Sequence, residues 1–182
     1  MHIKNLKKYY FINKFNYSHL VNLDKNISFI WRNKDKETSI ETLLKLSKFC
    51  RGNDRKFYIS NDIKLAIKIN ANGVYIPSTN KNLNFILIKT KKKFTILGSA
   101  HNLKEVKIKE LQNVQEIFIS PLFKSNRNPQ LNLYKYLNLK RCTFLKDISL
   151  GGINDTNIKK LEFLKPFGFA AISYFDKKKA PK

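Results

Sequence analysis

The sequence predicts a single α/β barrel of eight parallel strands with shortened helices. Short apolar runs rich in β-forming residues recur at fairly even intervals, at 9–13, 27–32, 57–60, 73–77, 94–99, 116–120, 147–151 and 167–173. The runs are continuous rather than alternating, which is typical of parallel strands buried on both faces. Helix-like segments separate them, and this alternation indicates βαβ units. Eight such units favour a closed barrel.

Three of the intervening segments carry signals for a helix start. Thr38 stands three residues before Glu41, which is the spacing of a capping box, and Asn102 stands likewise before Glu105. Asp155 is placed to cap a further helix after the seventh strand. We therefore expect helices to begin at these three positions.

The length of the chain leaves an alternative open. Barrels of this kind usually have about 200 to 250 residues, whereas this chain has 182. An open, doubly wound sheet is therefore the second interpretation. In either case we expect one domain over residues 1–175, followed by a basic C-terminal tail over 176–182.

The charge of the chain is compatible with several partners. Lys and Arg number 36 against 13 Asp and Glu, which gives a net charge of +23. Such an excess attracts nucleic acid, acidic membranes or phosphorylated metabolites. The lysines are scattered, however, so a solvated surface produced by coding bias is favoured over a dedicated polyanion site. No recognised motif supports nucleic-acid binding.

The compartment and the state of the cysteines can be predicted from the sequence. No apolar run has the length of a secretory signal core or of a membrane span, which favours a cytoplasmic protein without membrane contact. Cys50 and Cys142 lie among apolar residues without metal-binding spacing, so we expect both to be reduced and buried. The sequence carries no signal of an oligomeric state.

Polar and glycine residues follow nearly every predicted strand. In a parallel barrel the ligand groups come from the carboxyl ends of the strands, so these residues should share one rim. They include Arg32, Lys34, Ser60, Asn61, Asp62, Asn80, Ser99, His101, Ser125, Arg127, Gly151, Gly152 and Ser173. No dinucleotide or Walker glycine loop, zinc-protease motif, nucleophile elbow or paired carboxylates accompany them.

Two places on this rim favour a phosphorylated ligand. Gly151–Gly152 would let the main chain approach an anion, and a following helix would direct its N–H groups at that anion. A plain turn is the alternative. Arg32 and Lys34 offer two cations suited to phosphate or pyrophosphate, with a solvated basic loop as the alternative. His101, as a lone histidine, is more often a structural hydrogen-bonding residue than a base.

The order of the rim motifs resembles a known family. Arg32-x-Lys34 is followed by ISNDIKLA (59–66), NGVYIPSTN (72–80), GSAHNLKEV (98–106), SPLFKSNR (120–127), LGGIN (150–154) and AAIS (170–173). This series resembles thiamine-phosphate synthase and its paralogue, thiazole tautomerase. The resemblance implies a TIM barrel that couples hydroxymethylpyrimidine pyrophosphate to thiazole phosphate with magnesium and releases pyrophosphate.

The resemblance also implies roles for individual residues. It places Arg32, Lys34 and Ser99 around the pyrimidine pyrophosphate as catalytic groups. It assigns substrate binding to Ser60, Asn61, Asn80, Ser125, Arg127, Gly151 and Gly152, and to the main chain of Ile172 and Ser173 near the thiazole phosphate.

The sequence departs from the family at several of these positions. Ile30 replaces a Gln of the family, Ser60–Asn61 replaces Asn-Asp, and Asn80 replaces a second Asp. Asn128 replaces the Lys of the loop after the sixth strand, and Pro121 stands where the tautomerase has its His. Asp62 is then the carboxylate left for magnesium. Magnesium usually binds to one or two protein carboxylates together with phosphate oxygens. Two hypotheses follow. The chain is a synthase-like transferase, or it is a catalytically degenerate barrel that binds phosphorylated thiamine precursors or products without turnover.

Overall fold

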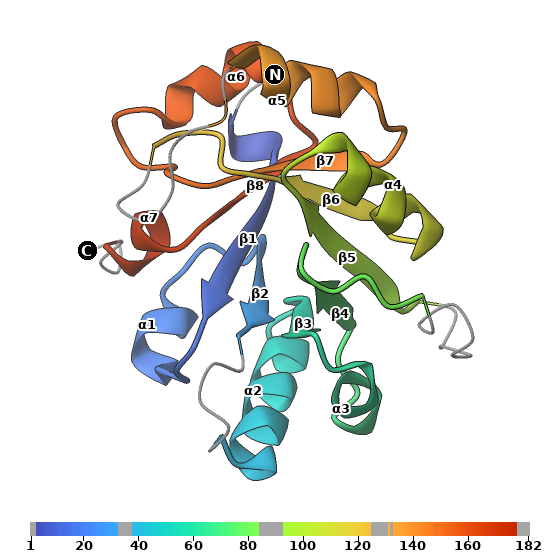
Figure 1. Cartoon of the computed structure of the whole chain (residues 1–182). Coiled ribbons are helices and arrows are strands. Elements are labelled where there is room, and N and C mark those ends of the chain that lie inside the picture. Colours follow the sequence, from blue (N-terminus) through green and yellow to red (C-terminus); the bar gives the residue numbers. More distant parts are fainter. Residues whose placement is uncertain (1–2, 33–37, 84–92, 125–130, 132, 178–182) are drawn as a thin grey trace.

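The structure, a computed structural model, describes residues 3–32, 38–83, 93–124, 131 and 133–177. Its eight strands are β1 (Lys7–Ile12), β2 (Ile27–Trp31), β3 (Phe57–Ser60), β4 (Gly73–Ile76), β5 (Thr95–Ala100), β6 (Glu116–Ile119), β7 (Lys146–Leu150) and β8 (Gly168–Ala171). Each strand pairs in parallel with the next, and β8 pairs with β1, which closes the barrel in chain order (Figure 1). The predicted closed barrel is confirmed, and the alternative interpretation, an open sheet, is wrong.

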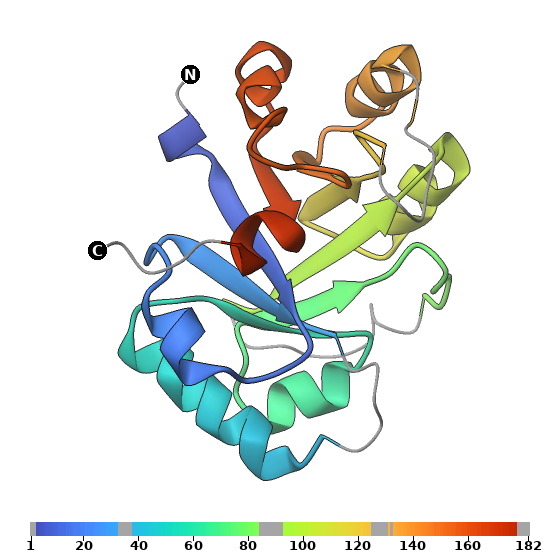
Figure 2. The same ribbon diagram turned by 90° about the vertical axis from the view of Figure 1, so that its left-hand side faces the viewer.

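The helices lie on the outside of the strands (Figure 2). They are η1 (Ile3–Asn5), α1 (Tyr17–Val21), α2 (Ile40–Gly52), α3 (Ile63–Lys68), α4 (Leu103–Leu111), α5 (Leu133–Arg141), η3 (Ile158–Lys160), α6 (Leu161–Leu164) and α7 (Ser173–Asp176). Within the described ranges α2 is the longest, with 13 residues, and α6 and α7 have four each. These short helices are how eight units fit into 182 residues.

The barrel interior is filled by side chains that alternate along the strands. Its members are Tyr9, Phe11, Ile30, Tyr58, Tyr75, Leu97, Phe118, Ile148 and Ala170, with exposures of 8% or less. At the amino-terminal end of β6, the buried Glu116 accepts hydrogen bonds from Tyr9 Oη and Lys7 Nζ. The barrel is therefore a packed core, and ligands must bind at its ends.

The predicted helix starts have three different outcomes. Asn102 caps α4 as predicted, since its Oδ1 accepts from the main-chain N–H of Glu105 at 2.9 Å. The prediction for Thr38 is wrong by one residue, because the neighbouring Ser39 caps α2 and accepts from Thr42 N–H.

The prediction for Asp155 is also wrong. The side chain of Asn154, one residue earlier, organises this turn by accepting from Thr156 N–H at 2.9 Å and Asn157 N–H at 3.2 Å. Helical structure then begins only at Ile158, with the three-residue η3. An Asn side chain bonds main-chain N–H groups as well as Asp does, so the two neighbours compete for this role.

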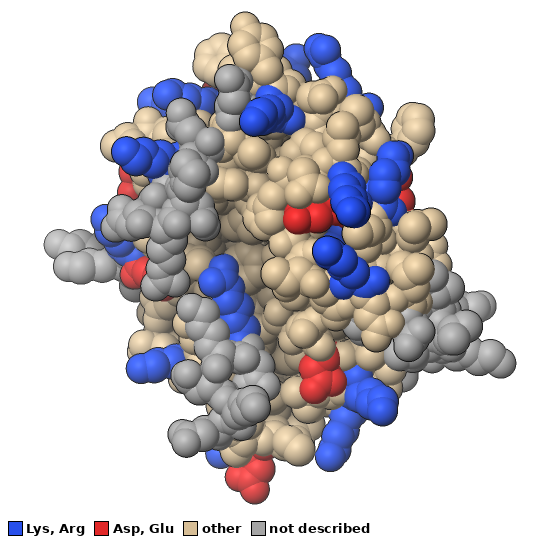
Figure 3. Space-filling model, viewed as in Figure 1, with Lys and Arg blue, Asp and Glu red and all other residues tan. Residues whose placement is uncertain are grey.

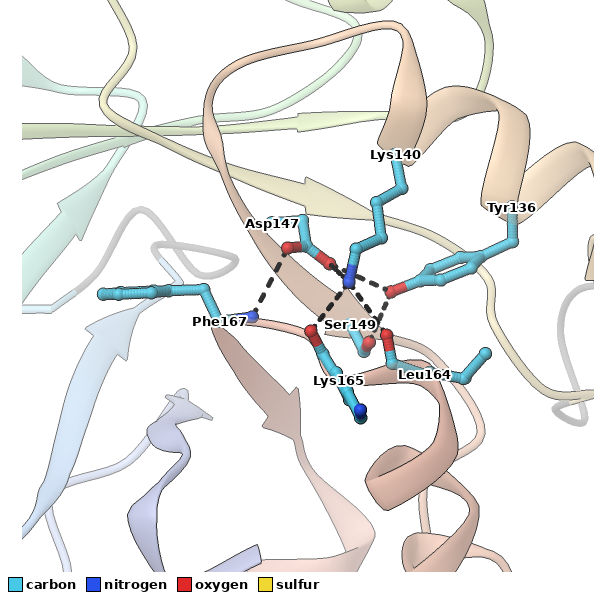
Figure 4. Close-up of polar contacts among 7 residues, drawn as sticks. All are labelled: Tyr136, Lys140, Asp147, Ser149, Leu164, Lys165 and Phe167. Atoms are coloured by element: carbon cyan, nitrogen blue, oxygen red, sulfur yellow. Dashed lines mark hydrogen bonds and ion pairs between the residues drawn. The ribbon is translucent and has the colours of Figure 1, made fainter. Parts of the chain in front are cut away.

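A partly buried polar network holds the short helix α6 against the barrel (Figure 4). Lys140 Nζ, from α5, lies 3.2 Å from Asp147 Oδ2 and donates at 2.8 Å to the carbonyl oxygens of Leu164 and Lys165. These two residues mark the end of α6, where Lys165 has a φ of 45°. Tyr136 Oη lies 2.6 Å from Ser149 Oγ on β7. The ammonium group thus satisfies helix-end carbonyls that four residues of α-helix leave unpaired.

The cysteines, the length of the helices and the surface charge can also be compared with the predictions. Cys50 is buried as predicted, but Cys142 is exposed near the end of α5, so that prediction is wrong; both thiols are free. The searched part of the chain contains no helix long and apolar enough to cross a membrane. On the face drawn in Figure 3, Lys and Arg side chains are scattered among uncharged residues.

The end of the described chain packs onto the barrel. Asp176, the last residue of α7, accepts a hydrogen bond from Tyr10 Oη on β1. Burial, together with Asp176, raises the pKa of Tyr10. Residues 178–182 of the predicted tail lie outside the described residues, so the tail remains a prediction.

Candidate functional site

Arg32 lies at the mouth of the barrel, just beyond the end of β2. Its main-chain N–H donates to Ile12 O at 2.9 Å, which continues the β1–β2 pairing by one residue. Its guanidinium carbon lies 4.4 Å from the ring centroid of Phe11, an interior residue of β1. Cation–π attraction holds a guanidinium over an aromatic ring, and a guanidinium suits bidentate binding of a phosphate.

Tyr75 and Ser99 stand beside this group on β4 and β5. The ring of Tyr75 packs edge-on against Phe11, with 5.1 Å between centroids. Burial raises the pKa of Tyr75, while a hydrogen bond with Ser99 and the charge of Arg32 act in the opposite direction. The structure therefore brings Arg32 and Ser99 together around the Tyr75 phenol.

Ser99 also fixes the loop that follows β4. It is only 4% exposed, and its Oγ accepts from the main-chain N–H of Ser78 at 3.0 Å. The predicted catalytic serine thus holds two elements of the rim in register. A hydroxyl with such fixed neighbours is preorganised for a further contact.

Asn61 and Asn80 are joined across the ends of β3 and β4. Asn61 has a φ of 61°, and its N–H donates to Tyr75 O at 2.8 Å. Its Oδ1 accepts from Asn80 Nδ2 at 2.7 Å. Ser60 lies directly before this pair at the end of β3 and is half-buried. Two neutral amides therefore occupy positions at which the resembled family has carboxylates.

Asp62 is the N-cap of α3. Its Oδ1 accepts from Leu65 N–H at 2.9 Å. In the searched part of the chain, no three His, Cys, Asp or Glu side chains are grouped as a metal centre would need. Beside Asn61 and Asn80, the described carboxylate available to magnesium is that of Asp62, and an ion there would depend on oxygens of a phosphorylated ligand.

A buried lysine on α4 holds the β4 loop from behind. Lys109 has 0% exposure, and its Nζ donates to Pro77 O at 2.9 Å, to Asn80 O at 2.8 Å and to Gln112 Oε1 at 2.8 Å. Gln112 Nε2 in turn donates to the carbonyl oxygens of Asn80 and Asn82. Burial lowers the pKa of Lys109 to about 8. We call this group, formed by Lys109 and Gln112, the α4 clamp.

His101 makes structural hydrogen bonds, which is the role expected for a lone histidine. Its Nδ1 lies 2.7 Å from the carbonyl oxygen of Ser120, and because a carbonyl can only accept, Nδ1 carries the proton. Its main-chain N–H donates to Glu105 Oε2 at 2.7 Å. The first bond ties the end of β5 to the residue after β6, and the second ties it to the first turn of α4.

Gly151 and Gly152 are required by the loop that follows β6. They have φ values of 100° and 67°, which L side chains rarely adopt. A Cβ on Gly152 would lie 2.5 Å from Phe123 O, and one on Gly151 would lie 2.8 Å from Pro121 Cα. The glycine pair therefore permits close packing of loop 121–124 beside the end of β7, where Phe123 N–H donates to Gly151 O.

Main-chain N–H groups collect where β7 and β8 end. Leu150 and Ala170 are register partners, so the residues that follow them leave neighbouring strands. No described residue accepts a hydrogen bond from the N–H groups of Gly152, Ile153, Ile172 or Ser173. Paired strand ends with unused amides are a suitable cradle for an anion. On the β7 side the cradle is formed by the main chain that precedes η3. The helix that we expected to start at Asp155 and direct its N–H groups at an anion is not formed there.

Three predicted site residues, Lys34, Ser125 and Arg127, lie outside the described residues. Four residues at the rim escaped sequence analysis: Phe11, Tyr75, Lys109 and Gln112. The inward position of Tyr75 follows from strand alternation once the barrel closes. Nothing in the sequence marks Lys109, because lysines in polar helices are usually exposed.

The fold and the rim define an eight-stranded parallel barrel whose candidate site is built at the carboxyl ends of the strands. Its residues 23–175 match the family model described as thiamine monophosphate synthase, and the chain belongs to that family. Thiamine-phosphate synthase of Pelagibacter ubique is 30% identical over 162 residues, covering 85% of this chain and 77% of that protein. A putative thiamine-phosphate synthase 2 of Aquifex aeolicus is 27% identical, covering 78% and 80%.

Solved structures agree on the fold. A thiamine phosphate pyrophosphorylase from Pyrococcus furiosus superposes with a TM-score of 0.73 at 16% identity, covering 94% of this chain and 88% of that chain. The citrate synthase SbnG superposes with a TM-score of 0.65 at 10% identity, covering 93% and 87%. Likeness at such identities extends to proteins named for different reactions, so it supports the fold and not the reaction.

Proposed function

We propose that this chain is a transferase that couples hydroxymethylpyrimidine pyrophosphate to thiazole phosphate. In this reaction the bond between the pyrimidine methylene carbon and the pyrophosphate oxygen breaks, and its electron pair leaves with pyrophosphate. The lone pair of the thiazole nitrogen then forms the new carbon–nitrogen bond. The chemical demand on the protein is to stabilise negative charge as pyrophosphate leaves.

The observation that carries this proposal is the position of Arg32. Its guanidinium lies over Phe11 at the mouth of the barrel, and its charge acts on the phenol of Tyr75, which hydrogen-bonds Ser99. We assign the pyrophosphate to this group, with Lys34 as a second cation. A guanidinium in a partly buried mouth stabilises a leaving phosphate more than an exposed guanidinium does.

The second substrate needs a separate phosphate site, and the cradle at β7 and β8 supports one. We propose that the N–H groups of Gly152, Ile172 and Ser173 bind the thiazole phosphate, because they point to no described acceptor. Ser60, Asn61 and Asn80 would line the part of the rim between Arg32 and Ser99, beside the pyrophosphate, because they follow β3 and β4. Ser125 and Arg127 would contribute from the loop after β6. Magnesium, when bound, would add charge stabilisation at the pyrophosphate, and Asp62 is the proposed carboxylate ligand.

A non-catalytic alternative is supported by the Asn61–Asn80 bond. The two amides hydrogen-bond each other at 2.7 Å, and neither carries the charge with which a carboxylate holds a metal. A barrel with this change could keep its phosphate sites and lose turnover. It would then bind phosphorylated precursors or thiamine phosphate without converting them.

One assay separates the two functions. The protein is incubated with both precursors, with and without magnesium, and thiamine phosphate and released pyrophosphate are quantified. Equal amounts of the two products support the transferase. No product at saturating substrate, together with calorimetric binding of thiamine phosphate, supports the non-catalytic alternative. Absence of both turnover and binding contradicts the proposed site.

A further inference from the structure

A basic cavity of about 370 Å³ lies at the opposite end of the barrel from the rim. Residues just before β3, β4 and β5 line it, together with the end of α2; they include Arg51, Asp54, Arg55, Lys56, Asn72 and Lys93. Its volume is within the range of small-molecule sites. The reaction proposed above makes no use of this end of the barrel.

The lining of this cavity is strongly positive. Among the described lining residues, Arg51, Arg55, Lys56 and Lys93 carry four positive charges, and Asp54 carries the single negative charge. Arg51, Lys56 and Lys93 are exposed and can reach a ligand. Asn72 Oδ1 accepts from Phe57 N–H at 2.8 Å, so the group that Asn72 can offer is its Nδ2 donor.

Arg55 is a fixed, buried cation in the cavity wall. It is 4% exposed, and its Nη1 and Nη2 donate to the carbonyl oxygens of Asp24 and Leu23 at 2.7 and 2.5 Å. Its Nε is buried without a hydrogen-bond partner among the described residues. The carboxylate of Asp24 is bonded to Lys8 Nζ at 2.6 Å. Neutral carbonyls thus hold the guanidinium in place, and the charge of Asp24, which also pairs with Lys8, offsets the cost of burying it only in part.

We infer that this cavity binds a small diphosphate-type anion. An anion seated among Arg51, Lys56, Lys93 and Asn72 would lie beside Arg55 and offset the cost of burying its charge. Burial lowers the pKa of Arg55, which is consistent with that cost. Arginine forks and lysine ammonium groups are the usual partners of phosphate oxygens.

The site is tested by calorimetric titration with inorganic pyrophosphate in 0.15 M salt, where long-range attraction is screened. The double variant Arg51→Gln/Lys56→Gln should weaken one binding event about tenfold or more, as expected when charge-assisted hydrogen bonds are lost. The control Lys64→Gln/Lys68→Gln removes two exposed charges from α3 outside the cavity and should leave that event unchanged. Arg32→Gln should leave it unchanged too, which separates this site from the rim.

Two further arms sharpen the result. Asp54→Asn removes the single carboxylate of the lining and should tighten binding; Asp54 has a φ of 53°, which Asn tolerates. ADP in place of pyrophosphate shows whether the diphosphate is accepted free or on an organic group. Equal binding by wild type and Arg51→Gln/Lys56→Gln, or equal weakening by the α3 control, would overturn the inference. Precursor coupling by Arg51→Gln/Lys56→Gln should match wild type, so the two proposals fail separately.

Discussion

The Nζ atom of Lys109 lies 2.8 Å from the main-chain oxygen of Asn80, and both its other acceptors are neutral as well. A fully buried ammonium on α4 thereby determines where the loop after β4 runs. That loop carries Ser78, which bonds Ser99, and Asn80, which bonds Asn61. The α4 clamp is thus connected to most of one side of the candidate site.

Replacing Lys109 by Met should therefore affect both stability and function. We expect Lys109→Met to lower the free energy of unfolding by about 1–3 kcal/mol, because buried carbonyls lose their donor. Substrate binding at the rim should weaken in the same variant. The control is Lys107→Met on the same helix, whose exposed ion pair with Glu110 contributes little. Equal stability of the two variants in urea titrations would contradict this role of the clamp.

The contribution of Lys109 to stability should depend on pH. Its pKa is lowered to about 8 in the folded protein, from 10.5. Between these values the unfolded chain binds more protons than the folded one, so the contribution of Lys109 rises with pH, by at most about 1.4 kcal/mol per unit. We expect the unfolding free energy of wild type minus that of Lys109→Met to be larger at pH 9.5 than at pH 7.5. A constant or falling difference would refute the lowered pKa.

Asp62 permits a separation of capping from metal binding. Asp62→Asn keeps an equally good N-cap for α3 but removes the carboxylate, whereas Asp62→Ala loses the cap at a cost of about 1 kcal/mol. If Asp62 is a magnesium ligand, Asp62→Asn should need more magnesium for pyrophosphate binding and turnover, at unchanged stability. Identical magnesium titrations of wild type and Asp62→Asn would leave Asp62 with its capping role alone.

Gly152 should tolerate no side chain. Gly152→Ala combines a φ of 67° with a Cβ 2.5 Å from Phe123 O, so the loop must shift, at a cost of about 1–3 kcal/mol. Because Gly152 belongs to the proposed phosphate cradle, binding of thiamine phosphate should weaken about tenfold or more. Gly52→Ala at the end of α2 is the matched control, since nothing lies within 4 Å of its added Cβ. Similar thermal unfolding and binding in the two variants would count against the cradle.

Much of the fold could be predicted because strands in a parallel barrel are buried on both faces. Every predicted strand lies within two residues of the observed one. The errors are local choices between similar neighbours, as at the start of α2, where Thr38 and Ser39 can both cap. A similar choice arises at Asn154 and Asp155, both of which can bond main-chain N–H groups.

Prediction of the site was less complete, for a different physical reason. The rim positions of Arg32, Ser99 and Gly152 follow from the ends of strands. The inward face of Tyr75 and the burial of Lys109 depend on closure of the barrel and on packing of α4, which local sequence does not encode. Cys142 illustrates the same limit, since its apolar neighbours do not bury it.

The most direct test of the account is the rate of precursor coupling in Arg32→Gln. This change removes the charge over Phe11 and keeps a polar side chain, and Arg141→Gln at the exposed end of α5 is the control. The account predicts that Arg32→Gln lowers kcat/KM about a hundredfold or more at unchanged stability, because transition-state charge loses its partner. Arg141→Gln should couple at the wild-type rate. Wild-type kcat/KM in Arg32→Gln would contradict the assignment of pyrophosphate to the mouth of the barrel.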